Sequence, residues 1–352
     1  MRERFVGLAS ITVLTIGLAW QLYEMYRSEQ VIAQLAVFTQ SGLADVDEAS
    51  GGAFDPERGI AYLVDDDEAK VFIFSASGAG GGYSPQGSFP LIDLTGEKLK
   101  NKTLEDLEAA AYHEGKLYLI TSHSNRRSGV EEARRQWFLE VSLEAEQRGQ
   151  VLRKSSPRDA ILARLDGPAG RHGEPLSANY MRDEEQQREM MNIEGLAIDG
   201  EGRAYLGFRN PLVDRKYAIV LRAGLDELFG PNPEFEAFLL PLSIKSNNYG
   251  ISDMAVDTLT GDILILANSS RRFEFFDPAL WRWRPAQMEG FQSARLVKAG
   301  LMKAPEHFRA KPEVLLVSND NRVTLFADAE AYGGQLSFTR AELGLQYLAS
   351  GR

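Results

Sequence analysis

The stretch NIEGLAIDGEGRAYLGFRN, from Asn192 to Asn210, contains the pattern that decides the fold. An acidic residue precedes a short apolar run, a turn of glycine and acidic residues follows, and a second β-prone run ends in polar residues. Two such runs joined by a turn of this composition predict an antiparallel pair of strands. Because the same order of features recurs along the chain, the sequence predicts a repeat protein.

Five copies of this pattern can be aligned. They cover Glu48–Phe74, Asp106–Ser124, Asn192–Asn210, Ile251–Ser270 and a fifth copy split between Met288–Phe291 and Glu313–Phe326. Their aligned residues Ser50, Glu108, Glu194, Asp253 and Glu289 are separated by 58, 86, 59 and 36 residues. A four-stranded propeller blade needs about 40 to 60 residues. We therefore expect an all-β fold, a β-propeller of five blades.

Six blades are the alternative, because the interval of 86 residues is long enough to hold one more. The segment from Arg153 to Met191 is rich in charge, however, and lacks an alternating pair of strands. We expect a helical excursion there, and an insertion from Ser293 to Pro312 in the fifth copy. The segment from Gln30 to Phe38 is either a closing strand that pairs with the last blade or a continuation of a preceding helix.

The first 24 residues predict a membrane segment. Arg2 and Arg4 precede an uncharged run from Phe5 to Tyr23, which approaches the length that spans a bilayer. The basic residues are expected to stay in the cytoplasm, which places the rest of the chain on the periplasmic or extracellular side. A cleaved signal peptide is the alternative, with the cut after Ala19. The expected organisation is an anchor or signal at 1–24, a linker or closing strand at 25–39, a propeller at 40–345 and a tail at 346–352.

The composition excludes several classes of protein. The sequence has 39 basic and 50 acidic residues, a net charge of −11, which disfavours nucleic acid as a partner. It has no cysteine and only four histidines, which exclude disulfides, a thiolate nucleophile and a cysteine-based metal centre. An apolar content of 44% is enough for a large core.

Several strings in the chain resemble an uncharacterised bacterial family of exported propellers. They are ASGGAFDPERGIAYLVDDDEAKV (Ala49–Val71), DLEAAAYHEGKLYLITSHSNRR (Asp106–Arg127), NIEGLAIDGEGRAYLGFRNP (Asn192–Pro211) and GISDMAVD (Gly250–Asp257). That family is similar to the esterase-like phytase and SdiA-regulated propeller domains. The resemblance covers roughly residues 45–326 and implies a propeller fold and a location outside the cytoplasm. The family has no settled activity.

The repeat geometry predicts a ring of carboxylates at one end of the central channel. The first strand of each copy is expected to line the channel, so Glu108, Glu194, Asp253 and Glu289 would converge on its axis, with Ser50 in the first blade's place. Carboxylates brought together raise one another's pKa or recruit a cation, and oxygen ligands suit Ca²⁺. We therefore name Glu108, Glu194 and Asp253 as metal-ligand candidates. The alternative is that the carboxylates accept hydrogen bonds from backbone amides of neighbouring blades.

A second polar set is expected on the same rim, where the second strand of each copy ends. Its members are Asp65, Asp66, Asp67, Ser122, His123, Ser124, Arg209, Asn210, Asn268, Ser269, Asn319 and Asp320. Together with Arg126 and Arg127, this rim mixes carboxylates, a histidine and guanidinium groups, which suits a small anionic or polar ligand. Local capping of strand ends is the alternative role for each of these residues.

Two functions fit these residues. The first is a membrane-tethered module that binds a ligand or a protein partner at the rim. The second is a calcium-dependent phosphoester or ester hydrolase, in which a carboxylate or His123 activates water and arginines hold the anion. The sequence favours the binding module, because one histidine and a spread ring of carboxylates form a sparse catalytic site.

Overall fold

The computed structural model describes residues 37–39, 46, 49–77, 82–100, 103–126, 128–167, 191–213, 216–242, 249–269, 279–285, 297–301, 312–319, 322–327 and 334–339. The predicted membrane segment and the predicted C-terminal tail lie outside these ranges. In the part of the chain that the structure describes, no helix has the length and apolar character needed to cross a membrane.

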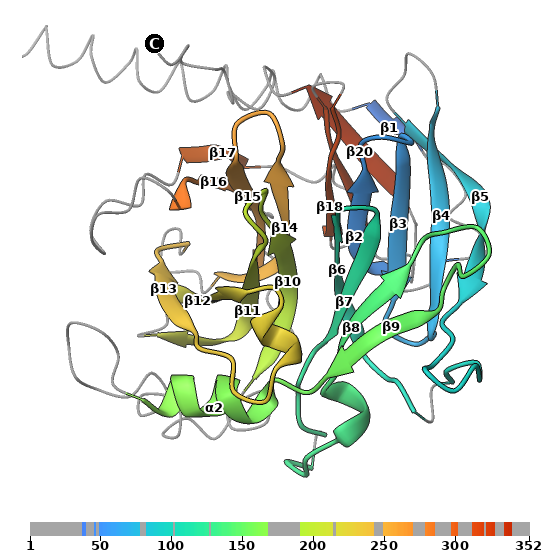
Figure 1. The fold of residues 1–352 in the computed structure, drawn as a ribbon. Helices are drawn as coiled ribbons and strands as arrows, with labels where there is room; N and C mark the ends of the chain where they lie inside the picture. Colours follow the sequence, from blue (N-terminus) through green and yellow to red (C-terminus); the bar gives the residue numbers. More distant parts are fainter. Residues whose placement is uncertain are drawn as a thin grey trace, which may run out of the picture.

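The described strands form five antiparallel sheets of four strands each, as expected for a β-propeller (Figure 1). The first sheet contains β2 (Ala49–Asp55), β3 (Ile60–Asp65), β4 (Lys70–Ser77) and β5 (Gly82–Pro90). The second contains β6 (Leu107–His113), β7 (Lys116–Thr121), β8 (Phe138–Ser142) and β9 (Val151–Ser155). The third contains β10 (Asn192–Ile198), β11 (Arg203–Val213), β12 (Tyr217–Gly224) and β13 (Glu236–Leu240). The fourth contains β14 (Tyr249–Asp257), β15 (Asp262–Ser269), β16 (Ala279–Trp283) and β17 (Val297–Leu301).

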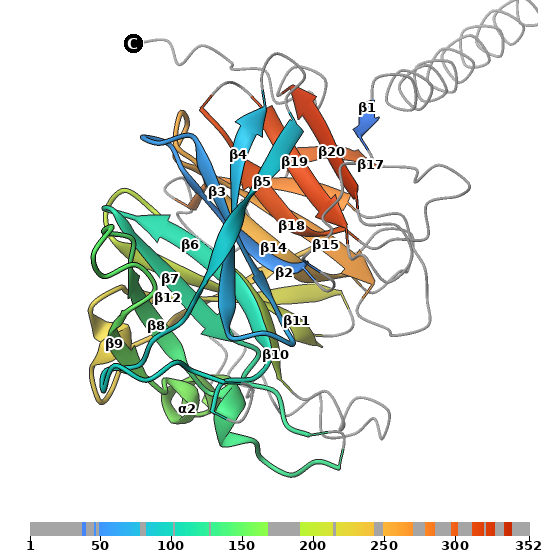
Figure 2. The same cartoon turned by 90° about the vertical axis from the view of Figure 1, so that its right-hand side faces the viewer.

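The fifth sheet joins the two ends of the described chain. Its order is β18 (Pro312–Val317), β19 (Arg322–Ala327), β20 (Gly334–Thr339) and β1 (Val37–Thr39). Strand β1 pairs antiparallel with β20 (Figure 2), which for Val37 and Phe38 is the closing-strand alternative of the two that the sequence left open. This pairing covers an edge of the last sheet, because a strand from the start of the chain satisfies backbone groups that would otherwise be exposed.

The innermost strands close into a ring. Strands β2, β6, β10, β14 and β18 each contact the next one, and β18 returns to β2. Five hydrophobic clusters fill the spaces between successive sheets, and each cluster combines side chains of two neighbouring sheets. The buried apolar side chains therefore lie between the sheets, and the ring surrounds a central channel. The prediction of an all-β propeller is confirmed.

The turns between first and second strands explain why the pattern was readable. In three of them an aspartate accepts hydrogen bonds from backbone amides that follow it: Asp55 from Glu57 and Arg58, Asp199 from Glu201 and Arg203, and Asp257 from Leu259. Each turn also has a glycine with positive φ, namely Gly59, Gly202 and Gly261. Aspartate caps the turn and glycine adopts a conformation that other residues avoid.

The fifth copy was placed incorrectly. The sequence put its first strand at Met288–Phe291, whereas the innermost strand of the fifth sheet is β18. Strands β18 and β19 both fall inside the stretch that was read as a single second strand. Their turn is short, with Ser318 N donating to Arg322 O at 3.0 Å. Met288–Phe291, and with it Glu289, lies outside the described residues.

The expected helical excursion is present after the second sheet. Helix α2 (Arg158–Asp166) buries Ile161 and Leu165 against the core between the second and third sheets. Figure 1 shows it at the lower end of the β10–β13 sheet. Arg158 holds the helix to the loop that follows β7, because its guanidinium donates to the His123 carbonyl and to Asn125 Oδ1. Residues 168–190, in which the alternative sixth blade was considered, are outside the described part.

Candidate functional site

Each innermost strand begins with an irregularity in its pairing. The register shifts by one residue near the start of β2, β6, β10, β14 and β18. The extra residues at these five bulges are Ser50, Glu108, Glu194, Ser252 and Glu313. A bulge leaves its extra residue outside the regular ladder and re-aims its side chain. Because the innermost strands occupy equivalent positions in the ring, these residues lie at one end of the channel, which we call the polar mouth.

An ion-pair bridge crosses the polar mouth. Arg209, on β11, donates from one guanidinium nitrogen to Glu194 Oε1 at 2.6 Å, and the same nitrogen lies 3.9 Å from Glu313 Oε1. Strands β10 and β18 are not neighbours in the ring, so the arginine links carboxylates from opposite sides. Asn192 Nδ2 also donates to Glu194 Oε1 at 2.7 Å. Glu194 is therefore a well-satisfied buried carboxylate.

Glu108 has different surroundings. It is half-buried, and among the described residues no donor forms a hydrogen bond to its carboxyl group. Burial raises its pKa well above the usual value, and the negative charges of Asp106, Glu194 and Asp66 raise it further, while Arg209 lowers it. A carboxyl group in this environment is stabilised when a positive group or hydrogen-bond donor approaches it.

Asp253 connects two sheets. Its carboxylate accepts from the backbone nitrogen of Leu315 in the fifth sheet at 2.7 Å and from Met254 N at 2.8 Å. The side chain is fully buried, and burial raises its pKa well above the usual value despite these backbone donors. Asp253 lies one residue beyond the bulge residue Ser252. For this residue the geometry is that of the alternative role, a hydrogen bond between neighbouring blades.

Two bulge residues make similar connections. Ser50 Oγ donates to the carbonyl of Leu107 in the second sheet and to Val64 O at 3.3 Å. Ser252 Oγ accepts from Asn268 Nδ2 at 2.9 Å, and the same amide donates to Pro312 O of the fifth sheet at 2.6 Å. The serines and Asn268 therefore stabilise contacts between sheets at the polar mouth.

His123 is buried away from the carboxylates. Its backbone contacts Arg135 and Arg158, and neither ring nitrogen has a hydrogen-bond partner among the described residues. Burial, assisted by the charge of Arg158, lowers its pKa to about 3, so the imidazole is neutral at physiological pH. Among the contacts that the described residues make, no hydrogen bond or ion pair joins His123 to Glu108 or Glu194.

Asn210 and Asn319 occupy different ends of the channel. Asn210 is buried and lies opposite Asn192 in the strand register. Asn192 is the residue whose side-chain amide donates to Glu194. Asn319 lies in the turn between β18 and β19, where Thr258 Oγ1 donates to it at 3.0 Å. That turn is at the end of the channel opposite the polar mouth, a consequence of the misplaced fifth copy.

Sequence reasoning missed three contributors to the polar mouth or its rim. Glu313 precedes the apolar run of β18 as Glu108 and Glu194 precede theirs, a signal that could have identified it. Asp106 accepts hydrogen bonds from Ser122 and Ser124 and forms an ion pair with Arg135 at 3.3 Å. No repeated sequence feature marks Arg135. In the described ranges, no cluster of three or more histidine or acidic side chains is arranged to hold a metal ion.

Comparisons with known proteins find structural neighbours but no family for this chain. No protein-family model matches the chain, and no curated protein does. Among solved structures, a calcium-binding protein, regucalcin, from Agrobacterium tumefaciens is 10% identical with a TM-score of 0.41, covering 86% of this chain and 93% of its own. An oxidoreductase (glucose dehydrogenase) from Thermus thermophilus is 12% identical with a TM-score of 0.36, covering 84% and 97%. These neighbours are propeller-like proteins, and similarity at this level carries no argument about function.

Proposed function

We propose that the chain is a membrane-tethered, five-bladed propeller outside the cytoplasm, and that its polar mouth binds a small ligand carrying an ammonium group. The observation that carries the binding proposal is Glu108, a channel carboxyl group with no hydrogen-bond donor among the described residues. A ligand N–H group would supply the missing donor and compensate the surrounding negative charge.

The charges at the mouth favour a cation over an anion. Arg209 is bound to Glu194, and Arg126 and Arg134 share Glu132. A phosphate group would have to displace a carboxylate from one of these arginines. A cation meets Glu108 directly, so the ammonium ligand requires no existing ion pair to break.

Calcium and the hydrolase alternative have less support from the described residues. Asp253 is engaged by two backbone amides, and Glu194 by Arg209 and Asn192. Two of the three carboxylates named as calcium ligands are thus already occupied. His123 is buried and neutral, so it does not supply a base beside the carboxylates.

The binding proposal predicts that Glu108→Gln weakens an ammonium ligand. The experiment titrates the full chain, in mild detergent and low salt, with putrescine and spermidine by calorimetry. A charge-assisted hydrogen bond contributes about 1.5–3 kcal/mol, so we expect affinity to fall by roughly tenfold or more. Because ligand binds the ionised carboxylate, whose pKa is raised in the free protein, affinity should increase as pH rises.

Glu114→Gln is the matched control, because Glu114 is an exposed glutamate in the turn at the opposite end of the channel. Its affinity for the polyamines should equal that of the unmodified chain. Calcium chloride and sodium phosphate are titrated in parallel. Binding of phosphate without binding of polyamine would overturn the cation assignment, and equal affinity in Glu108→Gln would remove Glu108 from the site.

The location proposal is supported by the Arg2 and Arg4 pair ahead of the apolar run. It predicts that a reporter enzyme that needs disulfide bonds is active when fused after Arg352, because such bonds form outside the cytoplasm. Deletion of residues 2–24 should abolish that activity. An intact mass that corresponds to a chain beginning at Trp20 would show that the segment is a cleaved signal peptide and not an anchor. Activity of a cytoplasm-specific reporter would contradict the proposed topology.

A further inference from the structure

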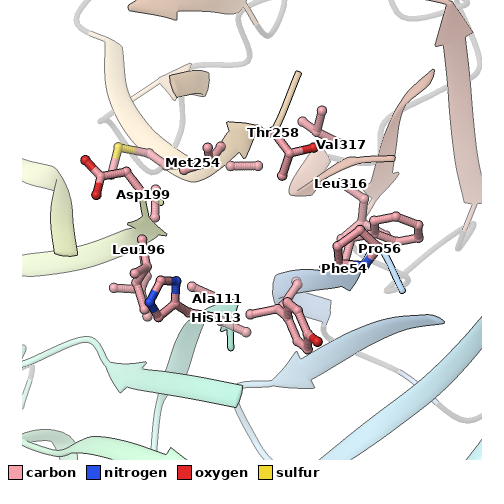
Figure 3. A pocket seen from close by; sticks show the side chains of 18 of the residues that line it. Phe54, Pro56, Ala111, His113, Leu196, Asp199, Met254, Thr258, Leu316 and Val317 are labelled. Atoms are coloured by element: carbon pink, nitrogen blue, oxygen red, sulfur yellow. The ribbon is translucent and has the colours of Figure 1, made fainter. Parts of the chain in front are cut away.

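A cavity of about 350 Å³ lies in the channel (Figure 3). It occupies the end of the channel opposite the polar mouth. Its wall comes from the later residues of all five innermost strands, which supply small or apolar side chains. They include Ala111, Leu196, Met254, Ala255, Leu316 and Val317. An apolar cavity offers water few hydrogen bonds, and binding of an apolar molecule is then favourable.

The cavity is separate from the polar mouth. The bulge residues stand at the beginning of each innermost strand, whereas the cavity begins two residues later on β2 and β6, at Gly52 and Ala110. The bridge formed by Arg209, Glu194 and Glu313 lies across the other end. The cavity rim is formed instead by turn residues, among them Pro56 and Thr258, which are labelled in Figure 3, and Glu114.

Most polar side chains at this rim are already engaged. Asp199 accepts from the guanidinium of Arg203 at 2.7 Å and from the Tyr205 hydroxyl at 2.9 Å. Thr258 donates to Asn319. The imidazole of His113 is partly exposed, lines the cavity, and forms no hydrogen bond to a described residue. His113 is therefore a partly buried polar side chain placed to recognise a ligand here, whereas the carboxylate of Glu114 is exposed to solvent.

We propose that this cavity binds a small, neutral, mainly apolar molecule with one hydroxyl group, which hydrogen-bonds to His113. An engineered cavity of ~150 Å³ accommodates benzene, so this volume suits roughly ten to fifteen non-hydrogen atoms. The lining contributes shape and apolar contact, and His113 contributes the preference for a hydroxyl group. A charged ligand is disfavoured inside the cavity, because the strand residues of the wall are small or apolar, and the carboxylates of Glu114 and Asp199 stand only at the rim.

The test uses 1-naphthol and naphthalene as probes, with binding to the full chain followed by probe fluorescence. We expect both to bind and 1-naphthol to bind more tightly. Ala255→Phe places a ring in the cavity and should weaken both probes at least tenfold. Leu259→Phe, in the exposed turn after the same strand, is the control and should leave both affinities unchanged.

His113→Ala provides a second, independent measurement that does not add bulk to the wall. It should weaken 1-naphthol and leave naphthalene unchanged, because only the hydroxyl group uses the imidazole. Failure of both probes to bind the unmodified chain would overturn the proposal, as would equal affinities for Ala255→Phe and Leu259→Phe. Equal loss of both probes in His113→Ala would overturn the assignment of His113 to the hydroxyl group. Polyamine binding at the other mouth should be the same in all three variants.

Discussion

Asp253→Ala is expected to lower the free energy of unfolding by about 2–4 kcal/mol, since a buried amide left without its acceptor costs about 1–3 kcal/mol. The substitution removes the acceptor for two buried backbone amides, Leu315 N and Met254 N. One of these bonds joins the fourth and fifth sheets. Denaturant unfolding at pH 7, compared with the unmodified chain, measures the difference.

Asp253→Asn is the matched control for this prediction. It keeps one side-chain oxygen at nearly the same position while removing the ionisable group. It should therefore lower the free energy of unfolding by less than Asp253→Ala does. If Asp253 acted as a metal ligand instead, calcium would stabilise the unmodified chain and neither variant. A loss below about 0.5 kcal/mol for Asp253→Ala, typical of surface substitutions, would contradict the role as a connection between sheets.

The fold was predictable because local and tertiary requirements coincide in the repeats. The Asp-to-Gly turns at Asp55, Asp199 and Asp257 mark the ends of innermost strands, and those strands are apolar because neighbouring sheets cover them on both faces. A pattern with this origin can be recognised in a single sequence, without an alignment. The outer strands follow no such rule: β5, for example, has four consecutive exposed residues.

The prediction for the fifth copy was wrong for a physical reason. Strand β18 contains only six residues, and its turn lacks the Asp-to-Gly signal, so the run through β19 resembles one continuous strand. The error moved the fifth carboxylate from Glu313 to Glu289 and moved Asn319 to the wrong end of the channel. Bulges caused the other displacement, since the extra residue in β14 is Ser252 and the predicted one was Asp253.

The sequence predicted where the carboxylates of the site lie better than it predicted which groups they contact. Glu108 and Glu194 were found because each acidic residue directly precedes a buried run. Their different environments depend on Arg209 and Asn192, which donate to Glu194 within the third sheet, and on Glu313 of the fifth sheet, which lies 3.9 Å from the Arg209 guanidinium. Individual side-chain contacts of this kind leave no periodic signal in the sequence, so the structure was needed to distinguish the bridged carboxylate from the one without a donor among the described residues.

The pH dependence of the free energy of unfolding should show the effect of the buried His123 imidazole. Its folded pKa is about 3, compared with 6.5 for an unperturbed histidine. Below pH 6.5 the unfolded chain binds a proton that the folded chain does not, so stability is complete above that pH and declines towards pH 3. At pH 4 the loss is about 3 kcal/mol, since one pKa unit corresponds to about 1.4 kcal/mol. Glu108 and Asp253 act in the opposite direction, because their raised pKa values favour the folded state at low pH.

His123→Asn isolates the contribution of the imidazole from that of the carboxyl groups. Asparagine does not titrate, and it tolerates the positive φ of 56° at this position better than most residues. Any loss of packing in the variant is present at every pH, so it cancels when the difference in unfolding free energy at pH 4 is compared with that at pH 7. That difference should shift by about 3 kcal/mol in favour of the variant on acidification. Parallel stability curves for the two proteins would mean that the imidazole accepts a proton in the folded chain, which requires a partner or water beside its ring nitrogens.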